Sequence, residues 1–332
     1  ADTFLPSGKM ALGANYWASH AATEMWRKWD AKAVEEDLRV LAANGFRLLR
    51  VFPNWADFQP IHACYLSANN FDKVNETRLF DAEEPLPDTP CGRAGVDERM
   101  VVRFEAFCDL AEKYGIRLIV PLLTGQMTFR NYIPPALANR NPFSDPYALM
   151  WEGRYLECMV SRLKAKKAIV AWESGNEARI LGKSENAFHS EAWLRYVHQT
   201  IRLADPSRPV IGVDGLEISR ETLWPSAMNA ALSDYTTTHP YGFWGAVYND
   251  DFLSVRSTTF AAAQTYALAQ IGGKPAFIEE HGSRRQEQAS QANVAKYMRN
   301  MLWNSWALDC RAMLWRCAYD QTGMTIAPYN WR

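Results

Sequence analysis

The sequence lacks a strong charge bias, a long hydrophobic run and the clustered histidines or cysteines that bind metals. Its formal net charge is −1, so no overall electric field favours a nucleic acid or an anionic membrane as a partner. No apolar stretch approaches the ~20 residues that a membrane-spanning helix needs. We therefore expect no nucleic-acid partner, no membrane partner, and no metal or other cofactor.

The six cysteines are scattered, and none has the spacing of a metal site. Cys108 and Cys158 fall in predicted helices, where buried thiols are the simplest interpretation. Cys64 and Cys91 share one long loop, and a disulfide between them is an open possibility. The chain begins Ala-Asp-Thr without a signal sequence, which suits a processed secreted or periplasmic protein as well as a shortened one.

Short apolar segments alternate with helical patterns along the whole chain. The predicted strands span residues 11–16, 47–52, 116–123, 168–172, 209–213, 235–238, 275–279 and 312–315. The predicted helices span 31–44, 97–114, 144–163, 186–204, 220–231, 253–271 and 286–306. Eight buried strands separated by helices indicate an α/β protein, a (β/α)8 barrel in a single domain over residues 1–332. A doubly wound sheet is the alternative, but residues 13–17 are not the phosphate loop that it would need.

Two segments depart from a regular barrel. Residues 53–96, after the second strand, form a long irregular segment rich in Pro, Asn and Asp, and such loops are usually functional. The residues after the eighth strand are interrupted by Pro and Gly and have no helical period, so we expect the last helix to be missing. Either the chain is shortened, or another chain or segment covers that apolar flank.

Polar and aromatic residues follow the predicted strands at their carboxyl ends, where barrel enzymes place catalysis. They include Arg50, Gln126, Asn176, Glu177, His239, Tyr241, Glu280 and Trp315. The fourth and seventh strands face each other across a barrel, so Glu177 and Glu280 should face one pocket. One glutamate after a strand is by itself more often a helix cap or a surface charge. A pair of carboxyl groups across a pocket is what hydrolysis of a glycosidic bond requires.

This ordered set of residues over five strands resembles the clan A retaining glycoside hydrolases, and it is most similar to glycoside hydrolase family 5, the cellulase and β-mannanase family. The resemblance covers nearly the whole chain. It implies a retaining hydrolase that cleaves β-linked oligo- or polysaccharides of the β-mannan or β-glucan type, with a carbohydrate substrate as its partner.

The resemblance also implies roles for individual residues. Glu177 would be the acid/base and Glu280 the nucleophile. Asn176 would bind the sugar 2-hydroxyl, and Arg50 and Tyr241 would keep the nucleophile ionised and oriented. Because an acid beside a second carboxylate resists ionisation, we expect the pKa of Glu177 to be raised.

The remaining residues are expected around this pair. His239 would line the same subsite or support Glu177, and Trp315 would be the platform beneath the reacting sugar. Gln126 stands where family members often carry a histidine, and it could take over a sugar hydroxyl. The side chain of Glu279 would point away, into the barrel wall or towards a helix, and Glu173 would be a structural charge. Trp17, Trp55 and Trp244 are candidates for further sugar platforms, with packing in the barrel wall as the alternative for each.

Other functions remain open on the sequence. An exo-acting β-glycosidase or a transglycosylase would use the same residues, and a non-catalytic sugar-binding barrel would need the fold without the chemistry. A metal-dependent barrel hydrolase would need a motif such as His-x-His after the first strand, and the six histidines show no such pairing.

Overall fold

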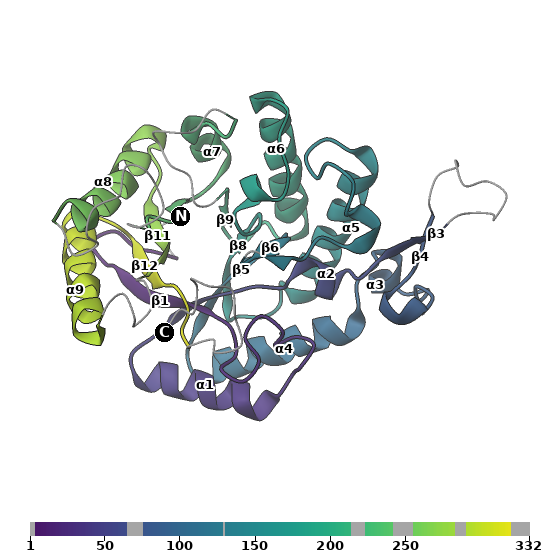
Figure 1. Ribbon diagram of the computed structural model, residues 1–332, viewed down its shortest axis with the longest axis horizontal. Coiled ribbons are helices and arrows are strands. Elements are labelled where there is room, and N and C mark those ends of the chain that lie inside the picture. Colours follow the sequence, from purple (N-terminus) through teal and green to yellow (C-terminus); the bar gives the residue numbers. More distant parts are fainter. Residues whose placement is uncertain are drawn as a thin grey trace.

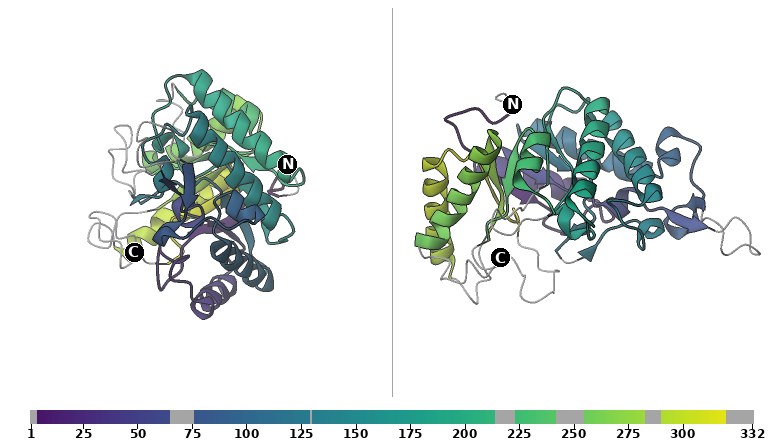
Figure 2. Two further views of the ribbon diagram at one scale, coloured as in Figure 1. Left: turned by 90° about the vertical axis from the view of Figure 1, so that its right-hand side faces the viewer. Right: turned by 90° about the horizontal axis from the view of Figure 1, so that it is seen from above.

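The computed structural model describes residues 4–64, 76–128, 130–213, 223–241, 255–282 and 290–319. In this part of the chain eight parallel strands form one sheet that closes into a barrel, with helices around it (Figures 1 and 2). The strands are β1 (Ala11–Tyr16), β2 (Leu48–Val51), β5 (Arg117–Pro121), β8 (Ile169–Glu173), β9 (Val210–Ile211), β10 (Thr236–Thr238), β11 (Ala276–His281) and β12 (Ala312–Trp315). The predicted (β/α)8 barrel is confirmed.

Neighbouring strands follow the order β10-β11-β12-β1-β2-β5-β8-β9. A single parallel bridge between Ile211 and Tyr235 joins the two edges of this sheet and closes it. The carboxyl ends of all eight strands therefore meet at one rim, which is what brings residues far apart in the sequence to a common site.

A helix follows each strand from the first to the seventh in the order expected of a barrel. These helices are α1 (Ala31–Ala43), α4 (Glu98–Lys113), α5 (Pro146–Leu163), α6 (Ala187–Ala204), α7 (Ser226–Leu232), α8 (Val255–Gly272) and α9 (Gln291–Ala307). Five of them begin after a side chain that accepts a hydrogen bond from the first turn, at Asp30, Asp97, Asp145, Asn186 and Ser290. Such caps accept hydrogen bonds from the first backbone N–H groups of the helix, which have no acceptor within the helix itself.

The segment predicted to be an irregular loop after β2 contains several short elements. They are α2 (Trp55–Phe58), β3 (His62–Cys64), β4 (Glu76–Leu79), η1 (Asp81–Glu83) and α3 (Pro90–Arg93). The β3–β4 hairpin projects away from the barrel (Figure 1). Gln59 anchors the segment, because its side-chain amide donates hydrogen bonds to the carbonyls of Ala94 at 2.8 Å and Trp151 at 3.0 Å. A small hairpin, β6 (Gln126–Met127) and β7 (Arg130–Asn131), and two short turns, η2 (Pro135–Leu137) and η3 (Ala178–Ile180), lie on the loops after β5 and β8.

The barrel interior changes from apolar to charged along the strands. Leu48 and Ala171 belong to the inner apolar cluster. Two residues further along the same strands, on the same face, stand Arg50 and Glu173, both fully buried. The alternation of side chains along a strand thus places a charged layer directly above the apolar one, at the catalytic end of a barrel.

Two expectations fall outside the described residues. The closing helix after the eighth strand was expected to be missing, and the residues concerned, 320–332, are not among those described. Trp244, a candidate sugar platform, also lies outside them.

The disulfide between Cys64 and Cys91 that the sequence left open does not form in this structure. None of the six cysteines is in a disulfide. Cys91 lies instead against Cys158 on α5, with 3.0 Å between the sulfur atoms. Cys108 is buried as predicted, whereas Cys158 is only partly so.

A buried carboxyl group between two barrel helices yields a prediction about stability. Glu152 on α5 is fully buried and accepts a hydrogen bond from the Trp193 indole at 2.9 Å. Burial raises the pKa of Glu152 well above its ordinary value, so the folded protein binds a proton there that the unfolded chain releases. Stability therefore falls as the pH rises from the unfolded pKa towards the folded one.

We expect Glu152→Gln to remove this pH dependence, because the amide keeps the shape and cannot ionise. The Tm of the variant should match that of the wild type near pH ~4 and exceed it by a few °C, on the order of 2–5, near pH ~8. Glu157→Gln, at an exposed position on the same helix, is the control. Parallel Tm curves for Glu152→Gln and the wild type would contradict the prediction.

Candidate active site

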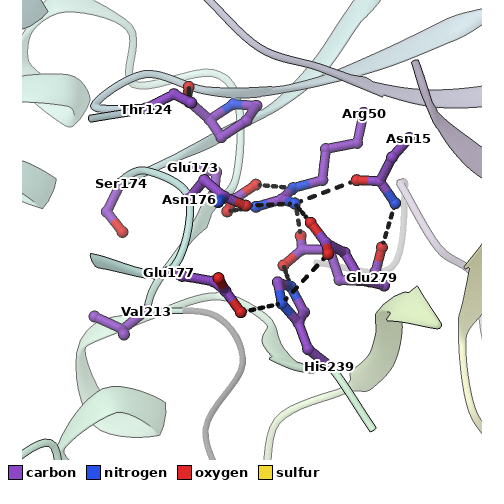
Figure 3. A network of polar contacts seen from close by, with 12 residues as sticks. Asn15, Arg50, Thr124, Glu173, Ser174, Asn176, Glu177, Val213, His239 and Glu279 are labelled. Carbon is purple, nitrogen blue, oxygen red and sulfur yellow. Dashed lines mark hydrogen bonds and ion pairs between the residues drawn. The ribbon is translucent and has the colours of Figure 1, made fainter. Parts of the chain in front are cut away.

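A buried guanidinium, that of Arg50, lies at the centre of the catalytic end of the barrel (Figure 3). Its Nε and Nη2 donate to the two carboxylate oxygens of Glu173 at 2.8 and 2.5 Å. Its Nη1 donates to Glu280 at 2.9 Å, to Asn176 at 3.1 Å and to Asn15 at 3.2 Å. One cation therefore connects side chains from four regions of the barrel rim.

The Glu280 carboxylate is surrounded by donors. The Tyr241 hydroxyl donates to Oε2 at 2.7 Å, and the Arg316 Nη1 donates to the same oxygen at 3.1 Å. Burial by itself would raise the pKa of Glu280, but the positive charges of His239, Arg316 and Arg50 and the Tyr241 hydrogen bond lower it to about 2. Glu280 is thus held as a carboxylate over the whole neutral range, as a nucleophile would need to be.

The backbone at Glu177 is bent sharply at the beginning of η3. Its φ of 44° lies in the left-handed region, which non-glycine residues adopt mainly where the surroundings impose it. Two residues earlier Gly175 passes so close to Leu123 that an added Cβ would lie 2.3 Å from the Leu123 carbonyl oxygen. The turn directs the Glu177 side chain, which is 21% exposed, to the rim (Figure 3).

The pKa of Glu177 differs from expectation. Burial raises it, but the hydrogen bond and the charge of His239, whose Nδ1 lies 3.2 Å from Oε1, outweigh burial and lower the pKa below its ordinary value. The expected rise is therefore wrong for this arrangement. The sequence placed a second carboxylate nearby but could not show that an imidazole lies closer.

His239 lies among three carboxyl groups. Its Nδ1 is 3.2 Å from Glu177 and 3.8 Å from Glu280, and its Nε2 is 3.6 Å from Glu279. Because one nitrogen reaches both Glu177 and Glu280, the nearest oxygens of these two carboxylates are at most about 7 Å apart. Retaining glycosidases have carboxyl separations of ~5–5.5 Å and inverting ones ~6.5–9.5 Å, so this bound includes the retaining separation and only the lower end of the inverting range.

Contrary to the expectation from the sequence, the Glu279 side chain does not point away from the site. Its side chain does not turn towards the barrel wall or a helix: it is fully buried beside the charged cluster, with Oε1 3.6 Å from the Arg50 Nε. The register between β11 and β12 shifts between Ile278 and His281. Such an irregularity re-aims side chains, so that the consecutive Glu279 and Glu280 both reach the same cluster.

Arg316, directly after β12, is a residue of the site that was not identified from the sequence. Its Nη1 donates to Glu280 at 3.1 Å and its Nη2 to the Thr128 hydroxyl at 2.9 Å, while its guanidinium lies 4.8 Å from the centre of the Trp17 ring. Only its place directly after a strand end, beside Trp315, could have singled it out, since nothing in the sequence shows that its side chain turns inwards.

The predicted aromatic platforms are packed differently from one another. Trp17 is buried and stacks on Phe52 with ring centres 4.5 Å apart. Trp55 is fully buried and its indole donates to Gln59 at 2.7 Å, so it packs in the wall. Trp315 is partly exposed at the end of β12, with its ring edge-on to His281 at 4.9 Å.

Asn176 is held from two sides. Its carbonyl oxygen accepts from Arg50, and its amide nitrogen donates to the Gln126 backbone carbonyl at 3.1 Å and to the Gln126 side-chain oxygen at 3.4 Å. Gln126 is therefore a neighbour of the cluster at the rim, as its place after the third strand of the barrel suggested.

The site consists of the ionised Glu280 carboxylate, held by Arg50 and Arg316, and the Glu177 carboxyl group, which is hydrogen-bonded to the His239 imidazole. Such a pair can attack a carbon centre and move a proton on opposite sides of one bond. Among the described residues, no group of three or more His, Cys, Asp and Glu side chains is arranged to hold a metal ion. No helix in the same part of the chain has both the length and the hydrophobicity of a membrane span.

Sequence comparison finds no matching family model. A mannan endo-1,4-beta-mannosidase A from Emericella nidulans is 30% identical over 262 residues, which cover 73% of this chain and 60% of that protein. A probable mannan endo-1,4-beta-mannosidase F from Aspergillus flavus is 26% identical over 226 residues, which cover 62% of this chain and 46% of that protein. The chain thus spans about half the length of the curated relatives that it matches first.

Solved structures share the fold over almost the whole chain. The exo-beta-1,4-mannosidase from Opitutaceae bacterium strain TAV5 superposes with a TM-score of 0.77 and 21% identity, over 97% of this chain and 54% of that one. At identities this low the likeness establishes the fold alone.

The contact between His239 and Glu177 yields a prediction that does not depend on activity. In His239→Leu the hydrogen bond and charge that lower the pKa are gone, so burial and the nearby Glu280 charge should raise the pKa of Glu177 above its ordinary value. A ¹³C-carboxyl NMR titration measures it, with Glu177→Gln identifying the signal. Unchanged titration of Glu177 in the variant would show that His239 does not control it.

Proposed function

We propose that this chain, which is related to the glycoside hydrolase family 5 barrels of clan A, is a retaining hydrolase of β-linked mannans. The observation that carries the proposal is the pair Glu177 and Glu280 at the ends of β8 and β11, both within reach of one His239 nitrogen. The names of the curated relatives, mannan endo-1,4-beta-mannosidases, favour a β-mannan over a β-glucan. A polymer too large to enter a cell suits the secreted or periplasmic location expected from the sequence.

In the first step the Glu280 carboxylate attacks the anomeric carbon. The bond from that carbon to the leaving oxygen breaks, and Glu177 gives its proton to this oxygen, so that a glycosyl ester of Glu280 and a free sugar hydroxyl result. Arg50, Tyr241 and Arg316 keep the attacking carboxylate ionised and oriented.

In the second step water attacks the same carbon. Glu177, now a carboxylate, takes a proton from the water as the carbon–oxygen bond to Glu280 breaks, and the sugar is released with its original anomeric configuration. Asn176 is assigned to the 2-hydroxyl of the reacting sugar, a contact that strengthens in the transition state.

The proton for the first step belongs to Glu177 and His239 jointly. The lowered pKa of Glu177 leaves its carboxylate ionised near neutrality, and we assign the proton of the resting site to its hydrogen-bond partner His239. The proton must pass to Glu177 when the leaving group departs. His239 is therefore a positioning residue that stores the proton within 3.2 Å of the acid.

Exo action is the second candidate, favoured by the likeness to the exo-beta-1,4-mannosidase of the same fold. Digestion of β-1,4-mannohexaose separates the two: an endo enzyme releases oligosaccharides from the first minutes, whereas an exo enzyme releases only the terminal sugar unit. Transfer of mannosyl units to added acceptors would identify a transglycosylase.

Substitution of the two carboxyl groups tests the chemistry. Glu280→Gln should lower turnover of an aryl β-mannoside to background, because the amide cannot attack. Glu177→Ala should lower it by roughly 10²–10⁴-fold, with azide restoring turnover and giving a β-mannosyl azide. Mass spectrometry after treatment with a 2-fluoro-mannosyl fluoride should find the sugar on the peptide that contains Glu280.

The control is Glu157→Gln, at an exposed position outside the site. A panel of aryl β-glycosides, β-mannans and β-glucans identifies the sugar. If the wild type binds mannan without cleaving any of these substrates, the protein is a sugar-binding barrel. If azide gives the α-mannosyl product in Glu177→Ala, azide replaces the nucleophile and the roles assigned to Glu177 and Glu280 are wrong. A wild-type product that is first formed with the α configuration would show inversion.

The charges around Glu280 predict a pH dependence. The pKa of Glu280 is about 2, and Arg316 is one of the cations that lower it, so Arg316→Gln should raise this pKa. Because the attacking carboxylate must be ionised, kcat/KM of the variant should fall at a higher pH on the acidic side, with kcat about 10²-fold lower near neutrality. Arg316→Lys should recover part of both effects. An acidic limb at the wild-type position would remove Arg316 from the proposed role.

A further inference from the structure

Two thiols from distant parts of the chain meet on the outside of the barrel. Cys91 lies on α3, in the segment inserted after β2, and Cys158 lies on α5. Their sulfur atoms are 3.0 Å apart, although 67 positions separate them in the sequence. Cys108 and Cys310, by comparison, are each buried in the protein interior.

A cavity of about 620 Å³ is lined by both cysteines, of which Cys158 is partly exposed and Cys91 is buried. Three arginines, Arg93, Arg154 and Arg162, and two glutamates, Glu98 and Glu157, also line it. The proposed catalytic residues do not line it. A small reagent in this cavity therefore lies next to the thiol pair and away from the carbohydrate site.

The surroundings also make one of the two sulfurs the better nucleophile. The hydrogen bond from Cys158 lowers the pKa of the Cys91 thiol, whereas burial and the Glu98 carboxylate raise it; Arg162, whose Nη1 is 3.6 Å from the Cys91 sulfur, also lowers it, and the net shift is downwards. The pKa of Cys158 is raised, chiefly by the same hydrogen bond. Burial raises the pKa of Cys310 to about 12, which makes that thiol inert at neutral pH.

We propose that Cys91 and Cys158 form an oxidation site, in which a low-molecular-weight disulfide such as oxidised glutathione converts the thiol pair into a disulfide that fastens α3 to α5. The Cys91 thiolate attacks one sulfur of the reagent and releases the first thiolate, leaving a mixed disulfide. The Cys158 thiolate then attacks the Cys91 sulfur and releases the second. The protein loses two electrons and two protons, and the reagent gains both as two thiols.

The bond would join the inserted segment to the barrel wall. In the reduced protein Gln59 already holds this segment through the Ala94 and Trp151 carbonyls, so the fold does not depend on oxidation. A covalent link between positions 67 residues apart restricts the unfolded chain and raises stability. The redox state would thus set the stability of the segment and leave the chemistry at Glu177 and Glu280 unchanged.

The test uses the full chain, incubated without denaturant in either reduced or oxidised glutathione. After alkylation and digestion without reductant, mass spectrometry should find a peptide pair linked through Cys91 and Cys158 in the oxidised sample, with two of the six thiols lost. The peptide map of the wild-type protein by itself shows whether the Cys91–Cys158 disulfide forms, so this test needs no variant. A bridge from Cys91 to Cys64, stable glutathione adducts, or six free thiols after equilibration would overturn the proposal.

Stability provides the second measurement. The Tm of the wild type should be higher in oxidised than in reduced glutathione by on the order of 5 °C. Cys158→Ser should abolish this difference, and Cys108→Ser, which removes a buried single thiol, should keep it. Turnover of an aryl β-mannoside should be equal in both redox states for the wild type. A Tm difference that persists in Cys158→Ser would place the oxidation elsewhere.

Discussion

The Arg50 guanidinium is the interaction on which the rest of the site depends. It is fully buried, and its donors are divided among Glu173, Glu280, Asn176 and Asn15. A buried charge is tolerated only when partners replace its hydration, and removing one member of such a group typically costs ~3–5 kcal/mol. The contacts that replace the hydration of Arg50 therefore also hold Glu280, the proposed nucleophile, at a fixed position relative to Asn176. Asn176 is the residue directly before Glu177, the proposed proton donor.

The charge balance of this cluster explains how a proton can be stored there. Among the described residues it joins four carboxyl groups, two guanidiniums and one imidazole: Glu173, Glu177, Glu279, Glu280, Arg50, Arg316 and His239. Four ionised carboxylates would exceed the two permanent cations, and buried like charges resist ionising together. His239, which contacts three of the carboxyl groups, is where an additional proton best offsets this excess.

On the outer surface of the barrel, a separate set of contacts attaches the inserted segment. Around α3 and α5 the inserted segment is held by the two hydrogen bonds of Gln59 and by the contact between Cys91 and Cys158. None of these groups touches the charged cluster. The protein can therefore change the attachment of this segment through thiol chemistry while the rim of the barrel keeps its geometry.

The sequence by itself determined the barrel and the pair Glu177 and Glu280. Period and composition define buried strands, and in a barrel the order of the strands along the chain fixes which carboxyl ends face each other. The resemblance to the clan A hydrolases also assigned Arg50 and Tyr241 to the surroundings of Glu280.

Only the tertiary structure decided how these side chains meet. It turned Glu279 inwards through the register shift in β11, placed His239 close enough to lower the pKa of Glu177, and added Arg316 as a second cation at Glu280. It also paired Cys91 with Cys158. One physical reason applies to all four of these contacts. The local sequence pattern determines only the course of the backbone. Charges, hydrogen bonds and sulfur contacts act over a few ångströms between residues as far apart in the chain as Arg50 and Glu280, so only the packed barrel sets them.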